Sequence, residues 1–99
     1  MRLDAWEVAA IVECLQESFG HGAKVYLFGS RTDDSKRGGD IDLFVECSPL
    51  PEDWRGRKSD FWICLQERLG EQRIDILVAR DPDDPIERIA RRDGILLEG

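Results

Sequence analysis

The stretch FGSRTDDSKRGGDIDLFVE, residues 28–46, combines a Gly-Ser pair, a polar loop and two aspartates one residue apart. It is preceded by KVYLF, residues 24–28, a short apolar and β-branched run that predicts a buried strand. After the loop of residues 29–39, the segment DIDLFVEC at 40–47 has the composition of a second strand. We therefore expect two strands joined by a polar loop.

The two aspartates of this stretch are expected on one face of the second strand. Side chains alternate between the faces of a strand, so Asp40 and Asp42 point one way and the apolar residues between and after them point the other. Like charges a few ångströms apart repel each other and are costly to desolvate without a cation. A divalent metal ion is the simplest such cation. The alternative is a solvated strand face, which is common in acidic proteins.

A third carboxylate is expected from RIDILVA, residues 73–79, which predicts another strand. Its isoleucines and valine form an apolar face, and Asp75 projects the other way. If this strand lies beside the 40–47 strand with matching faces, Asp75 joins the aspartate pair. Three carboxylates suit Mg²⁺, and two such ions about 3.5–4 Å apart can activate an attacking oxygen and stabilise a leaving one.

The Gly29-Ser30 pair stands where the chain must turn at the end of an apolar strand. Small side chains leave backbone amides open to an anion there, and Ser30 adds a hydroxyl donor. Arg31 adds a guanidinium that can reach a phosphate or an acidic neighbour. The alternative interpretation is an ordinary turn.

The rest of the chain predicts three helices and completes the order αββαβα. Residues 4–19 show helical spacing of apolar residues. A loop begins at residue 48, and the second helix that follows it ends at Leu69, before Gly70. A last helix begins at Pro85, with Asp84 and Glu87 spaced as a capping box. The final ILLEG is either a short strand or a docking tail. We expect one α+β domain over residues 1–99, a small mixed sheet covered by helices in two layers.

Composition excludes several functional classes. The 99 residues carry 14 basic and 21 acidic side chains, a net charge of −7, which argues against direct nucleic-acid binding. No apolar run approaches the roughly 20 residues that span a bilayer, and the N-terminal MRLDAWEVAA lacks the layout of a secretory signal. We therefore expect a cytoplasmic protein without membrane contact. Its three cysteines are widely spaced in apolar patterns, which predicts reduced, buried thiols.

Taken together, these motifs resemble the signature of the nucleotidyltransferase superfamily that includes polymerase beta. The match is to its smallest members, the minimal nucleotidyltransferase (MNT) proteins, and extends over nearly the whole chain, because DPIERIARRDGILLEG is similar to the way such proteins end. The resemblance implies that Asp40, Asp42 and Asp75 are the catalytic carboxylates and Mg²⁺ ligands. It also implies a nucleotide-binding set at the turn, formed by Gly29, Ser30 and Arg31.

The same resemblance implies a reaction and a partner. An acceptor hydroxyl would attack the α-phosphate of ATP with two Mg²⁺ ions present, and pyrophosphate would leave. MNT proteins are commonly paired with a helical HEPN RNase toxin, which active members silence by transferring AMP to a tyrosine. Two alternatives stay open: a non-catalytic antitoxin that acts by binding its partner, and a transferase for a small-molecule hydroxyl. The sequence leaves the nucleotide preference, the acceptor and the oligomeric state open.

A docking surface is one interpretation of the segment around two tryptophans. Trp54 and Trp62, with basic residues between them, have the composition that protein interfaces favour. The alternative is that Trp62 belongs to the core and Trp54 caps a loop. Likewise, Arg88, Arg91 and Arg92 of the last helix are either a solvated face or a contact for the triphosphate or partner.

Overall fold

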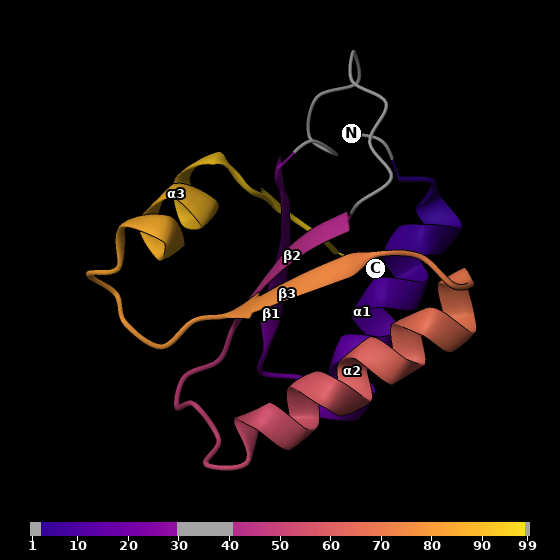
Figure 1. The fold of residues 1–99 in the computed structure, drawn as a ribbon, viewed down its shortest axis with the longest axis horizontal. Coiled ribbons are helices and arrows are strands. Elements are labelled where there is room, and N and C mark those ends of the chain that lie inside the picture. Colours follow the sequence, from indigo (N-terminus) through magenta and orange to yellow (C-terminus); the bar gives the residue numbers. More distant parts are fainter. Residues whose placement is uncertain (1–2, 30–40, 99) are drawn as a thin grey trace.

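The computed structural model describes residues 3–29 and 41–98 and has the predicted α+β fold (Figure 1). Its elements, in chain order, are α1 (Ala5–Phe19), β1 (Lys24–Phe28), β2 (Ile41–Glu46), α2 (Trp54–Leu69), β3 (Ile74–Val78), α3 (Pro85–Asp93) and β4 (Ile95–Leu96). The expected order αββαβα is confirmed. The C-terminal ILLEG supplies a short strand. None of the helices in the described part of the chain is long and apolar enough to cross a membrane.

The four strands form a mixed sheet in the order β3-β2-β1-β4. β1 pairs antiparallel with β2 on one side and with β4 on the other, while β2 and β3 are parallel. Parallel neighbours need a crossover connection, and α2 provides it. The crossover places β2 and β3 side by side with both strands running in the same direction. From the sequence alone, this pairing is only a condition for Asp75 to lie beside the other aspartates.

One face of the sheet forms the main core with α1 and α2. The inward residues of β2 are Ile41, Leu43 and Val45, all fully buried, and β3 contributes its isoleucines and Val78. Phe61 of α2 packs edge-on against Phe19 of α1, with ring centroids 6.2 Å apart. The alternation predicted for both strands is therefore confirmed on their apolar sides.

The other face of the sheet is covered in part by α3, which lies opposite the α1 and α2 layer (Figure 1). Ala90 of α3 packs with Phe44 of β2 and with Ala79, which follows β3. These contacts lie toward the C-terminal ends of β2 and β3. Asp42 and Asp75 lie nearer the N-terminal ends of these strands, where Phe28 of β1 is the register partner of Asp42.

The starts of α1 and α3 agree with the sequence in position, and one expected contact at α3 differs. Glu7 accepts a hydrogen bond from the backbone N–H of Asp4 at 2.9 Å, as a capping box requires. At α3, Asp84 accepts from the N–H of Ile86 at 2.8 Å. Glu87 does not complete the expected box. It is 2% exposed and instead accepts from the backbone N–H groups of Arg80 and Asp81, so it joins α3 to the segment that follows β3.

The expectation of reduced thiols is wrong for two of the three cysteines. Cys14 of α1 and Cys64 of α2 form a disulfide across 50 positions of sequence, with their Cα atoms 5.7 Å apart. The two helices pack against each other, and this brings together side chains that spacing alone could not pair. Beside the disulfide, Arg68 of α2 bonds Glu13 of α1 at 2.7 Å. Cys47 keeps a free thiol.

Candidate catalytic site

Two of the predicted carboxylates lie next to each other on adjacent strands. Asp42 of β2 and Asp75 of β3 are register partners, and neighbouring strands run about 4.8 Å apart. Ile41 and Ile74, one residue earlier in each strand, are also register partners and point into the core, so both aspartates point to the opposite face. Asp42 is half-buried and Asp75 is exposed. The condition stated for Asp75, that the two strands lie side by side with matching faces, is met.

The Asp42 carboxylate lies directly against Gly29. Phe28, the last residue of β1, is the register partner of Asp42, so the next residue of the chain lies at the same end of the sheet. Gly29 has φ of +80°, and a Cβ placed on it would collide with the Asp42 carboxylate oxygen and lie 3.2 Å from its Cγ. Only glycine meets both requirements. The sequence predicted an anion-binding turn here, and the structure adds that glycine makes room for the carboxylate.

The remaining predicted site residues, Ser30, Arg31 and Asp40, lie outside the described residues. Within residues 3–29 and 41–98, no group of three metal-ligating side chains comes together. The structure therefore brings together Asp42, Asp75 and Gly29, and does not test the predicted roles of Asp40, Ser30 and Arg31.

The donors that are described fit a hard divalent cation. Asp42 and Asp75 supply carboxylate oxygens from rigid strands, and oxygen is what Mg²⁺ prefers. Two anionic groups in register on adjacent strands repel each other, and a bound cation removes that cost. Exposure of Asp75 leaves space for water or substrate oxygens to complete the coordination. This donor set can hold a metal and, with it, the phosphates of a nucleotide.

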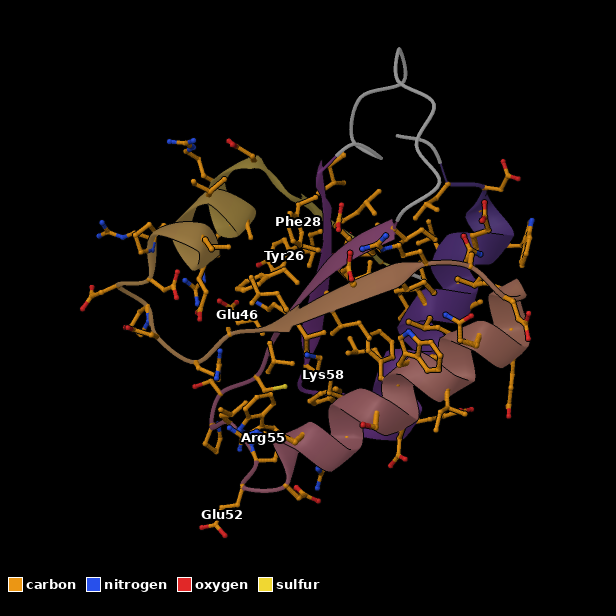
Figure 2. The ribbon with its side chains drawn as sticks, in the orientation of Figure 1. Tyr26, Phe28, Glu46, Glu52, Arg55 and Lys58 are labelled. Carbon is orange, nitrogen blue, oxygen red and sulfur yellow. A yellow bond between two sulfur atoms is a disulfide. The ribbon has the colours of Figure 1, made fainter. Side chains whose placement is uncertain are left out.

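A wall beside the site is formed where α3 meets the sheet. Figure 2 shows Tyr26 and Phe28 on the side of the sheet that faces α3, and the ring of Tyr26 lies 5.9 Å from that of Phe44. Arg91 of α3 donates to Glu46 of β2 at 2.6 Å, and this hydrogen bond raises the pKa of Arg91. α3 is therefore held to the sheet by a charged contact as well as by Ala90. Arg91 is committed to this contact and does not form part of the solvated face suggested by the sequence.

A groove of about 710 Å³ adjoins the site on its other side, between α2 and β3. Asp75 lines it together with Trp62 and Ile63, whose side chains are 44% and 49% exposed. The alternative that Trp62 belongs to the core is therefore wrong. Trp54 is half-buried under two guanidinium groups, with Arg55 at 4.4 Å and Arg80 at 5.1 Å from its ring. The sequence indicated the tryptophans but not that the isoleucines of β3 face them across a groove, because β3 is a separate element.

Residues 8–97 match the family model of the nucleotidyltransferase domain. The match includes the whole of the sheet, the three helices except the first residues of α1, and both described aspartates. A search of curated proteins found no match. The family model thus covers the same residues that carry the geometry above.

Proposed function

Because the chain belongs to the nucleotidyltransferase domain family of the polymerase-beta-like superfamily, we propose that it transfers AMP from ATP to a hydroxyl group of a partner protein with Mg²⁺ as cofactor. The partner we propose is a helical HEPN RNase, which the chain would silence as its antitoxin. Family membership supports nucleotidyl transfer in general. The protein acceptor, the nucleotide and the toxin-antitoxin role are the proposed parts.

The observation that carries the proposal is the register between Asp42 and Asp75. Strand pairing, rather than a mobile side chain, fixes both carboxylates on one face. Gly29 keeps the space beside the Asp42 carboxylate open from the neighbouring strand. Nucleotidyl transfer needs such a preorganised anionic pair and little covalent chemistry from the protein.

In the proposed reaction, each described residue has a defined task. Asp42 and Asp75 would hold Mg²⁺, which neutralises the charge that develops on the phosphates. Backbone amides at the Gly29 turn would bind the triphosphate. The acceptor oxygen would form a bond to the α-phosphorus as the bond to the bridging oxygen of the β-phosphate breaks, and pyrophosphate leaves. The exposed carboxylate of Asp75 would take the proton from the acceptor hydroxyl.

The test is to incubate the protein with its genomic neighbour and MgATP and to weigh the neighbour by intact-mass spectrometry. We expect the added mass of one adenylyl group, absent with Asp42→Asn. Asp83→Asn is the matched control, because Asp83 is an exposed carboxylate outside the site. If the wild type neutralises its neighbour and leaves its mass unchanged, the proposal of protein AMPylation is wrong and the non-catalytic antitoxin is supported.

A further inference from the structure

We propose that the groove between α2 and β3 binds an extended, acidic segment of the acceptor protein, which pairs with the outer edge of β3 and brings its hydroxyl group to Asp75. The inference rests on the proposed transfer to a protein and adds where and how that protein docks. Four observations carry it: a strand edge, an apolar wall, basic side chains without a carboxylate partner among the described residues, and the position of Asp75.

β3 presents a strand edge along the groove. It stands at one end of the sheet order, and no strand of the described chain pairs with its outer side. The carbonyl of Arg73 accepts from Ile41 and the N–H of Ala79 donates to Val45, so these flanking residues point their main chains toward β2. By alternation, the N–H and C=O groups of Ile74, Ile76 and Val78 point outward. An added strand would find donors and acceptors there.

The groove also offers an apolar wall that runs beside this edge. Trp62 and Ile63 of α2 face the isoleucines of β3 across it, and both side chains are about half exposed. A strand laid along β3 would turn alternate side chains toward this wall. Exposed aromatic and aliphatic groups in a concave site are the anchors that peptide recognition uses.

The charge of the groove selects an acidic segment. Arg55 and Lys58 line it, and Figure 2 shows both on the N-terminal half of α2. Within the part of the chain that the structure describes, no carboxylate pairs with either of them, whereas Arg57 between them is bonded to Asp53 at 2.8 Å. In a protein with a net charge of −7, this is a local basic surface. Acidic side chains would complement it.

Asp75 belongs both to the groove and to the proposed catalytic site. Asp75 lines the groove and is also the register partner of Asp42. Gly29 lies on the other side of Asp42, because β1 and β3 flank β2 on opposite sides. A nucleotide bound at the Gly29 turn and a peptide bound along β3 would therefore reach the carboxylate pair from opposite sides, as an in-line displacement requires.

The test uses random ten-residue peptides displayed as a library and selected on the full chain without nucleotide or metal. We expect enrichment of peptides with acidic residues beside alternating apolar ones. A synthetic copy of the most enriched peptide should bind the double variant Arg55→Glu, Lys58→Glu about tenfold or more weakly. Arg88→Glu, an exposed arginine on α3, is the matched control and should bind as the wild type does.

The strand pairing is tested on the peptide itself. In a bound strand, every second backbone amide of the peptide faces β3. N-methylation of these amides should abolish binding, and N-methylation of the intervening amides should leave binding nearly unchanged. Asp42→Asn should bind the peptide normally even though it transfers nothing, which separates this inference from the proposed reaction. Three results would overturn it: no enrichment, equal binding by the groove variant, or displacement of the peptide by a non-hydrolysable ATP analogue, which would assign the groove to the nucleotide.

Discussion

Replacement of Gly29 by alanine separates the two requirements that the structure places on this residue. Its φ of +80° strains any side chain, at a cost of roughly 1–3 kcal/mol in folding stability. The added Cβ would also collide with the Asp42 carboxylate, which must then leave its position. Displacement of a reacting group by about 1 Å can cost on the order of a hundredfold in rate. Gly29→Ala is therefore expected to lose much more activity than stability.

Gly70→Ala is the matched control. Gly70 has φ of +87°, close to that of Gly29, and no atom lies within 4 Å of a Cβ placed on it. Urea unfolding should show similar losses of stability for the two variants. In thermal unfolding, each loss of about 1 kcal/mol of stability should lower the Tm by roughly 4–8 °C. The rate of AMP transfer to the genomic neighbour should fall only in Gly29→Ala. Equal activity of the two variants at a temperature where both are folded would refute the role assigned to Gly29.

Three further predictions follow from other contacts. Reduction of the Cys14–Cys64 disulfide should cost about 4 kcal/mol in urea unfolding by the loop-entropy model, since it closes a loop of 50 positions, and a loss below 1 kcal/mol would contradict that model. Burial raises the pKa of the Cys47 thiol, an effect that Arg57 opposes and Glu46 reinforces. The rate of Cys47 alkylation by iodoacetamide should therefore reach half its maximum at a higher pH in the folded protein than in urea. The same or a lower midpoint in the folded protein would refute this. Glu87→Ala would remove the acceptor of two N–H groups, at a cost of about 1–3 kcal/mol for each in urea unfolding. Glu87→Gln keeps one acceptor oxygen and should cost less; equal losses in the two variants would refute the role assigned to this acceptor.

The arrangement of the strands could be predicted because each carries a clear alternation. Ile41, Leu43 and Val45 mark one face of β2, and RIDILVA repeats the pattern, so parity alone separated the core from the aspartates. The register between Asp42 and Asp75 was different. It depends on how far α2 carries the chain before it returns, which no local pattern encodes.

The features missed by the sequence join distant segments. The disulfide depends on the packing of α1 against α2, and Cys14 and Cys64 give no spacing signal of their own. Glu87 has the spacing of a capping residue, yet its carboxylate accepts hydrogen bonds from two backbone N–H groups in the segment after β3 instead. The groove beside Asp75 was indicated only by Trp54 and Trp62, since its second wall belongs to β3.

The most direct measurement of the central claim, that Asp42 and Asp75 form one nucleotidyl-transfer centre, is the fate of labelled phosphorus. With ATP labelled at the α-phosphate, the wild-type chain and Asp83→Asn should label the genomic neighbour in the presence of Mg²⁺. Asp42→Asn and Asp75→Asn should each abolish the label, and ATP labelled at the γ-phosphate should release it as pyrophosphate. Label that arrives from the γ-phosphate, or that persists in either aspartate variant, would contradict the account.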